Sequence, residues 1–236
     1  MPERFLIVGP CRSGTTMFLR SVKNHPNAMI EFQTIKTGQR QQGAPDYSFF
    51  QRPVPDDKFL VNKETIGYAT DEDCTLQVFP NDEAIRATRP VFIFRKPRDT
   101  FVSWIENDLV DADQTTHLFI QAYRHTFELL MHARTASEHA SALSYEVLCT
   151  NPQQKLQTVC NKWDIEFHPH MIDWQDQFIE TTPLDRDGID QGHYRTVSTS
   201  SSIASQKPKS GLSQSQAKEI DQELEEIYEK IMRLVL

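Results

Sequence analysis

Apolar residues along the chain follow two patterns: short uninterrupted runs, and longer segments in which they recur every three or four positions. The short runs predict buried strands, whereas the wider spacing predicts helices that pack through one face. The last segment has the helical spacing at Ile220, Leu224, Ile227 and Ile231. The expected strands lie at residues 4–9, 28–32, 59–63, 90–95 and 141–145, and the expected helices at 14–24, 72–79, 82–88, 97–109, 114–136, 152–163 and 213–233.

Strand-like and helix-like segments alternate, which predicts an α/β fold with a mostly parallel sheet and helices on both faces. The 236 residues, 38% of them hydrophobic, can enclose one sizeable core, so we expect residues 1–236 to form a single domain. Two stretches look irregular: residues 34–57, rich in Gln, Gly and Pro, and residues 178–209, with the run STSSS. Long irregular segments in compact domains are often lids or binding loops, so we expect both to cover a site.

The first expected strand leads into a loop at residues 9–16 with the sequence GPCRSGTT. Small residues let the backbone approach an anion closely, and the start of the next helix offers N–H donors and partial positive charge. In ATP- and GTP-binding loops a Lys follows the second glycine and reaches the β- and γ-phosphates. Here a Thr stands in that place and the loop's cation comes earlier, which suits a nucleotide without a γ-phosphate or an obligatory metal. The candidate anion-binding residues of this loop are Arg12, Ser13, Gly14, Thr15 and Thr16.

A second candidate anion site follows the apolar run VFIF, which ends at Arg95. Pro97 favours the start of a helix, because its φ is fixed and it lacks an N–H. Ser103, eight residues after Arg95, would then lie less than two turns into that helix and could share an anion with Arg95. The same strand end argues against a P-loop kinase, in which an Asp would be needed to hold Mg²⁺.

These motifs resemble those of the sulfotransferases that use 3′-phosphoadenosine-5′-phosphosulfate (PAPS). The family's 5′-phosphosulfate loop, Lys or Arg followed by S-G-T-T, is similar to residues 12–16, and its R-x-P-x-D signature with a later Ser is similar to residues 95–103. Residues 144–152 resemble the family's strand ending in Y-E-x-L followed by N-P, and residues 206–213 resemble the loop that closes over the cofactor. The resemblance spans essentially the whole chain and implies a P-loop NTPase-like sulfotransferase fold.

The resemblance also implies a chemistry, with PAPS as the sulfuryl donor, adenosine 3′,5′-bisphosphate (PAP) as the product and no required metal. Arg12 would stabilise the bridging oxygen that becomes a phosphate anion, since preorganised charge is usually the largest catalytic term. Arg95, Ser103 and Lys207 would bind the 3′-phosphate. Tyr145 would line the adenine pocket.

A second cation and a general base complete the expected site. Lys63 ends the expected strand at 59–63 and resembles a Lys that contacts the leaving group in the tyrosyl-protein and cytosolic branches of the family. Glu31 is the first choice for the base, because it follows a His-Pro-Asn turn like that of branches with a catalytic Glu. Thr65 occupies the place of the catalytic His of the cytosolic branch, which removes that mechanism. Glu64 is the rival, although on a strand it would point away from Lys63; His25 and the lid segments are further candidates.

Net charge and composition limit the classes of partner that we expect. A formal net charge of −8 argues against nucleic acid as the main partner. Neither the four cysteines nor the histidines between residues 117 and 139 have metal-like spacing. The opening MPERFLIV has too few consecutive apolar residues for a secretory segment or a membrane span, so we expect a cytoplasmic protein. The expected acceptor is a small molecule such as a secondary metabolite; a P-loop kinase and a catalytically silent PAP-binding module are the alternatives.

Overall fold

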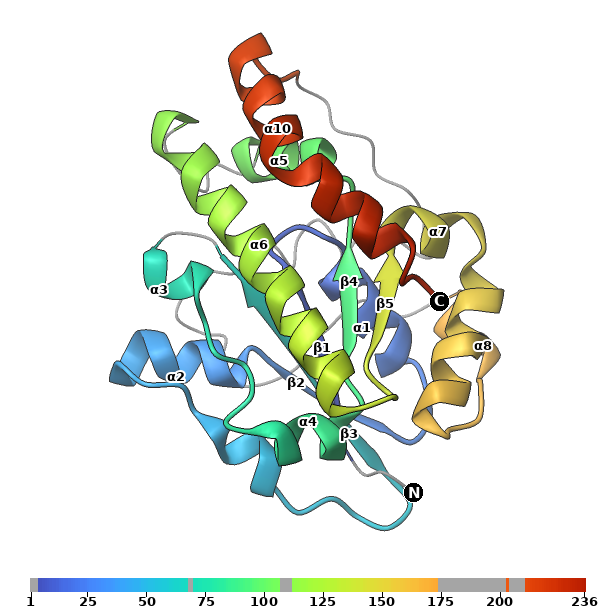
Figure 1. Ribbon diagram of the computed structural model, residues 1–236. Coiled ribbons are helices and arrows are strands. Elements are labelled where there is room, and N and C mark those ends of the chain that lie inside the picture. Colours follow the sequence, from blue (N-terminus) through green and yellow to red (C-terminus); the bar gives the residue numbers. More distant parts are fainter. Residues whose placement is uncertain (1–3, 68–69, 107–111, 174–202, 204–210) are drawn as a thin grey trace.

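A five-stranded parallel sheet forms the centre of the molecule in a computed structural model, which describes residues 4–67, 70–106, 112–173, 203 and 211–236 (Figure 1). The strand order is β2-β3-β1-β4-β5, and every neighbouring pair is parallel. This arrangement confirms the predicted α/β fold class. The strands are β1 (Arg4–Pro10), β2 (Ala28–Phe32), β3 (Phe59–Ile66), β4 (Val91–Phe94) and β5 (Ser141–Ser144).

Helices connect the strands and cover both faces of the sheet. They are α1 (Thr15–Lys23), α2 (Thr34–Gln42), α3 (Asp71–Cys74), α4 (Asp82–Thr88), α5 (Pro97–Ile105), α6 (Ala112–Ala136), α7 (Tyr145–Thr150), α8 (Pro152–Trp163) and α10 (Gln214–Met232), with 3₁₀ turns η1 (Tyr47–Gln51) and η2 (Pro169–Met171). Among the described helices, none is both long enough and apolar enough to cross a membrane.

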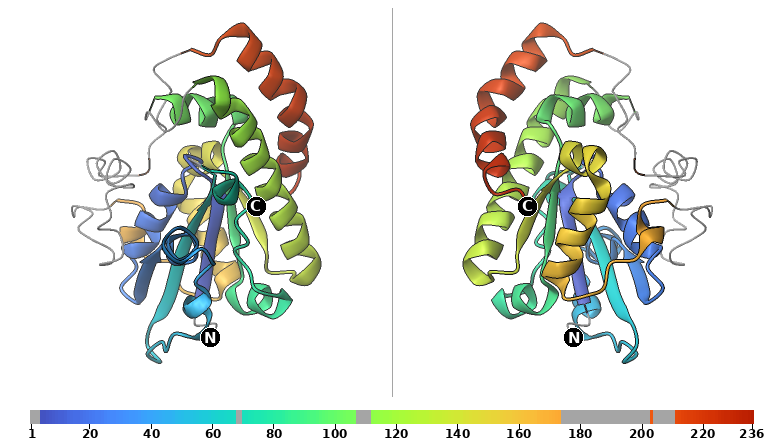
Figure 2. Two further views of the ribbon diagram at one scale, coloured as in Figure 1. Left: turned by 90° about the vertical axis from the view of Figure 1, so that its left-hand side faces the viewer. Right: turned by 90° about the vertical axis from the view of Figure 1, so that its right-hand side faces the viewer.

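Alternate strand residues point to opposite faces and build two hydrophobic cores. We call them the α1 face, where Phe5 and Ile7 meet α1 and α8, and the α6 face, where Leu6 and Val8 meet α5, α6 and α10. Figure 2 shows these helices on the two sides of the sheet. On the α1 face Phe5 stacks on Trp163 with ring centroids 4.4 Å apart. The expected stripe of the last helix packs as predicted, since Ile220, Leu224 and Ile231 are all buried.

Several expected elements differ from the structure. Strand β3 continues three residues beyond the expected end at residue 63. The expected helix at 72–79 is a single turn, and Leu76 and Val78 enter the core from a segment that is neither helix nor strand. Residues 34–57 were expected to be irregular but contain α2 and η1, held by contacts with the sheet described below. The expected lid at 178–209 lies outside the described residues except for Ile203, which is buried.

We predict that Gly67→Ala destabilises the protein by about 3 kcal/mol, combining a left-handed backbone with overpacking. Gly67 has φ +86°, and a Cβ there would lie 2.6 Å from Ala122 Cβ and 2.6 Å from the Trp104 ring. Gly43→Ala is the matched control, because Gly43 also has a positive φ, +74°, but faces open space. Urea unfolding should give a loss of about 1 kcal/mol for the control. Equal losses in the two variants would contradict the packing argument.

Candidate active site

The loop after β1 has the strand–turn–helix geometry expected of an anion site. Ser13 N–H donates to the Pro10 carbonyl at 3.1 Å, which turns the chain back on itself. Gly14, with φ +98°, immediately precedes α1, and Arg12 also adopts a left-handed conformation, with φ +68°. The Ser13 hydroxyl is buried and has no hydrogen-bond partner among the described residues. The loop thus presents small residues, a strained Arg and a helix N-terminus at one point.

The loop is fastened to the neighbouring strand and to α5. Cys11 N–H donates to the Ile66 carbonyl at the end of β3, at 2.8 Å. The indole N–H of Trp104 donates to the Cys11 carbonyl at 2.7 Å, and the indole is completely buried. Both backbone groups of Cys11 are therefore used, and the thiol is buried. Cys11 acts as a fixed point of the loop rather than as an exposed thiol.

Four of the predicted binding residues meet beside this loop. Arg12 Nε donates to Ser103 Oγ at 3.0 Å, although the two residues are 91 positions apart in sequence. The Arg95 guanidinium lies over the Tyr145 ring, 4.7 Å from its centroid. The same ring packs against the loop, since a Cβ at Gly14 would lie 2.4 Å from Tyr145 Cδ2. The structure therefore brings together the loop, the end of β4, α5 and the start of α7.

The two arginines are close enough to affect each other electrostatically. Burial lowers the pKa of Arg12, and the positive charge of Arg95 lowers it further. Arg95 is itself only 6% exposed. Like charges held together away from water repel strongly, and an anion between them would relieve that repulsion. The arrangement is suited to a ligand with more than one anionic group.

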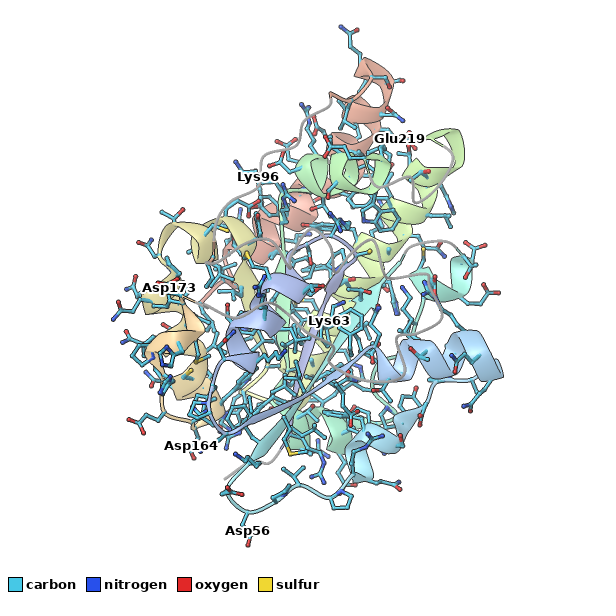
Figure 3. All side chains as sticks on the ribbon, turned by 180° about the vertical axis from the view of Figure 1, so that it is seen from behind. Asp56, Lys63, Lys96, Asp164, Asp173 and Glu219 are labelled. Carbon is cyan, nitrogen blue, oxygen red and sulfur yellow. The ribbon has the colours of Figure 1, made fainter. Side chains whose placement is uncertain are left out.

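Lys63 lies on the α1 face but does not end its strand as expected. It pairs with Ile7 and Phe32 in the sheet register, three residues before β3 ends. Its side chain is 1% exposed, and Nζ sits 3.9 Å from the centroid of the Phe32 ring. Figure 3 shows Lys63 near the centre of the molecule. Lys63 is a buried cation within the sheet, on the face that α1 covers.

Glu31 is placed on the other face. It pairs with Asn62, one position before Lys63, so its side chain points to the α6 face. Its Oε1 lies 2.5 Å from Arg52 Nη1, and its Oε2 accepts a hydrogen bond from the Thr34 hydroxyl at 2.9 Å. The structure therefore brings Glu31 to Arg52 and Thr34 rather than to Lys63. Its predicted role as the base has no support from this geometry and stays a prediction.

Glu64 also points to the α6 face, as expected, and it caps a helix. Its carboxylate accepts hydrogen bonds from Ile35 N–H at 2.8 Å and Lys36 N–H at 3.2 Å, at the start of α2. The Asn62 amide donates to it at 2.8 Å. Burial raises the pKa of Glu64 to about 7, against the three N–H donors that lower it. This contact between β3 and the first N–H groups of α2 explains why α2 forms in a segment that lacks helical patterning.

The structure does not bring His25, a further candidate for the base, to the loop. His25 precedes β2, whereas the loop follows β1, so they lie at opposite ends of the parallel strands. His25 Nε2 lies 2.9 Å from the Glu166 carbonyl, and its Nδ1 accepts a hydrogen bond from Asn27 N–H. Both ring nitrogens are thus engaged. The predicted phosphate contact Lys207 lies outside the described residues.

At the sequence level Thr65 served only to exclude a histidine mechanism, and the polar pair that it forms with Gln33 next to the loop was missed. Thr65 pairs with Gly9 in the register and follows Lys63 on the same strand face. Its hydroxyl donates to the Gln33 side-chain oxygen, and Gln33 N–H donates to the Lys63 carbonyl at 2.8 Å. The two-residue alternation along β3 was the signal that could have found Thr65. Gln33 could not have been found locally, because its left-handed backbone, with φ +52°, arises at the β2–α2 junction.

The fold is shared with sulfotransferases of known structure. Neither a protein-family model nor a curated protein matches the sequence. The sulfotransferase domain from the curacin biosynthetic pathway matches with a TM-score of 0.56 at 13% identity, over 95% of this chain and 98% of that one. The sulfotransferase domain of the Synechococcus PCC 7002 olefin synthase gives 0.51 at 11%, over 94% of each chain. Mouse sulfotransferase SULT7A1, solved with PAP, gives 0.50 at 15%, over 72% of this chain and 61% of that one.

These comparisons define the class of the protein by its fold. The chain is a single α/β domain with the sulfotransferase fold, a central five-stranded parallel sheet flanked by helices. At 11–15% identity the likeness establishes the fold alone.

We predict that Glu64 makes the protein less stable as the pH rises from about 4.5 to about 7. Its pKa is 4.5 unfolded and about 7 folded, so the folded state binds more protons in this range. The free energy of unfolding should therefore fall by about 3 kcal/mol across it and then level off. Urea unfolding of Glu64→Gln at several pH values should lack this decline, whereas the exposed Glu83→Gln should retain it. The same pH slope in wild type and Glu64→Gln would disprove the assignment.

Proposed function

We propose that the protein is a PAPS-dependent sulfotransferase that transfers the sulfuryl group to a hydroxyl or amine of a small molecule. The observation that carries the proposal is the meeting of Arg12, Ser103, Arg95 and Tyr145 beside the loop at Gly14. Two adjacent guanidinium groups and a buried Ser13 hydroxyl, which has no partner in the described part of the chain, fit a ligand with phosphates at two ends. A fold relative solved with PAP supports the same choice of nucleotide.

The residues divide between two anion pockets. At the first pocket, Arg12 stabilises the oxygen that gains negative charge during transfer, while the backbone N–H groups at the start of α1 bind the 5′-phosphosulfate. At the second, Arg95 and Ser103 bind the 3′-phosphate, with Lys207 as a proposed third contact. Tyr145 packs beside the adenine, and Lys63 contributes a second buried cation. PAPS, when bound, supplies the sulfuryl group and leaves as PAP; no metal is part of the proposal.

The general base is proposed from the sequence rather than from the geometry. Glu31 would have to release Arg52 or Thr34 before its carboxylate could take a proton from an acceptor. Glu64 is less suitable, because both of its oxygens receive backbone N–H groups and it is fully buried. Glu31 is therefore kept as the hypothesis that the variants below test.

The proposed partners follow from charge and from the nucleotide. The net charge of −8 supports a small acceptor, such as a secondary metabolite, over nucleic acid. A cytoplasmic location is part of the proposal. Segments 34–57 and 178–209 are proposed to border the acceptor.

Two measurements test the proposal against its alternatives. Calorimetry should show micromolar binding of PAP, whereas binding only of ATP with Mg²⁺ would favour a P-loop kinase. Transfer of labelled sulfate from PAPS to a panel of hydroxyl and amine acceptors should then detect turnover. PAP binding without transfer to any compound, and without PAPS hydrolysis, would favour a silent binding module.

We predict opposite kinetic effects for the two arginines. Arg12→Ala should lower kcat by about 100-fold while leaving the PAP dissociation constant within about threefold, because its charge acts mainly on the transition state. Arg95→Ala should raise the PAP dissociation constant by about 30-fold, with a smaller effect on kcat, because it binds the nucleotide throughout. Arg86→Ala, on the exposed surface of α4, is the control. Equal changes of both quantities in both variants would contradict these roles.

For the base, we predict that Glu31→Gln abolishes sulfuryl transfer while PAP binding is retained. Arg52→Met is the matched variant, because it breaks the same ion pair but leaves the carboxylate in place. If Glu31 acts as the base, only Glu31→Gln should lose turnover. Equal losses of turnover in Glu31→Gln and Arg52→Met would indicate that Glu31 only holds Arg52 in place. Loss of turnover in Glu64→Gln alone would assign the base to Glu64.

A further inference from the structure

One carboxylate joins three elements next to the predicted nucleotide site. Glu146, in the first turn of α7, accepts a hydrogen bond through Oε1 from Lys96 N–H at 2.8 Å. Its Oε2 accepts from the Ser144 hydroxyl at 2.8 Å and from the Tyr228 hydroxyl at 3.4 Å. The turn after β4, the end of β5 and the last helix, α10, therefore converge on Glu146. Figure 3 shows Lys96 toward the end of the molecule where α5 lies.

One of these contacts, the hydrogen bond from Lys96 N–H, bears directly on Arg95. Lys96 is the next residue, so Glu146 holds the peptide that follows Arg95. The carbonyl of the same peptide, that of Arg95, accepts a hydrogen bond from the buried Tyr123 hydroxyl at 3.0 Å. Tyr145, whose ring lies beneath the Arg95 guanidinium, immediately precedes Glu146 in the chain. The peptide bond after Arg95 is thus held at both its carbonyl and its N–H. Glu146 binds that peptide and adjoins Tyr145 in the chain, so it is linked to both members of the Arg95–Tyr145 pair.

The link to α10 has a defined donor. Burial raises the pKa of Tyr228, and the neighbouring Glu146 charge raises it further, so the phenol keeps its proton and donates to the carboxylate. A second contact joins the same elements, because Arg98 of α5 pairs with Asp221 of α10. Arg98 in that pair is exposed and Asp221 half-buried, whereas the Glu146 contact with Tyr228 is partly buried. The Glu146 contact is the better candidate for a stabilising link.

We propose that Glu146 is a positioning residue for the 3′-phosphate, setting Arg95 against Tyr145 and tying α10 to the same point. The inference rests on the proposed function. Glu146 touches neither pocket directly and acts through the two residues beside it. Without its carboxylate, Lys96 N–H loses its acceptor and the Arg95–Tyr145 pair loses its common support. The cost should fall on ligands that carry a 3′-phosphate.

Calorimetry on the full chain with PAP and with adenosine 5′-monophosphate tests the proposal, because the second ligand lacks the 3′-phosphate. Glu146→Ala should raise the PAP dissociation constant about tenfold and that of the monophosphate less than about twofold. Glu146→Gln should restore most of the PAP affinity, since its amide oxygen can accept from Lys96 N–H. Glu83→Ala is the control: Glu83 is also the second residue of a short helix, α4, but is exposed.

The outcomes separate positioning from mere stability. If Glu146→Ala weakened the binding of both ligands equally, or changed the affinity for neither, the proposal would be overturned. Tyr228→Phe tests the link to α10. It should raise the PAP dissociation constant by a smaller factor than Glu146→Ala does, and it should raise it little further when combined with Glu146→Ala. If the effects of the two substitutions on the binding free energy of PAP were fully additive, the proposed role of α10 would be wrong. If wild type does not prefer PAP over the monophosphate, the proposed function fails first and the inference falls with it.

Discussion

The strict alternation of side chains in the parallel sheet is the constraint on which the site depends. Because neighbouring strands are in register, each position in β2 and β3 is committed to one face. Lys63 faces α1, whereas Glu31 and Glu64 both face α6. A shift of one residue in either strand would exchange these assignments and place charges in the opposite core. Register therefore decides which of the candidate charged residues of β2 and β3 share a face of the sheet.

Buried charges on the α6 face organise the structure around the sheet. A charge removed from water must be compensated by partners, and here the partners come from segments distant in sequence. Glu64 accepts the first N–H groups of α2, and Lys36 from that helix donates to the Gly67 carbonyl at 2.5 Å. Arg40 binds Asp73 through two hydrogen bonds, which fixes α3. The polar cluster thus anchors the segments that follow β2 and β3.

Beside the loop after β1, the site is assembled from contacts that combine small residues with cations. The loop after β1 reaches the end of β3 through Cys11, and it reaches α5 through Arg12. Tyr145 closes against Gly14 because the glycine has no side chain to exclude the ring. Arg95 completes the arrangement from β4. The same geometry that suits the proposed two-ended anionic ligand also requires neighbouring positive charges to be held together by the surrounding packing.

The sequence by itself determined the alternation of strands and helices, the loop before α1, the helix start at Pro97 and the apolar stripe of α10. These features are local, since they follow from periodicity, glycine placement and proline's fixed φ. Tertiary structure alone decided the direction of Glu31, the burial of Lys63 and the existence of α2. It also decided the role of Glu146, which depends on Lys96 and Tyr228, 50 and 82 positions away. Such roles depend on register and on partners distant along the chain, which no local pattern encodes.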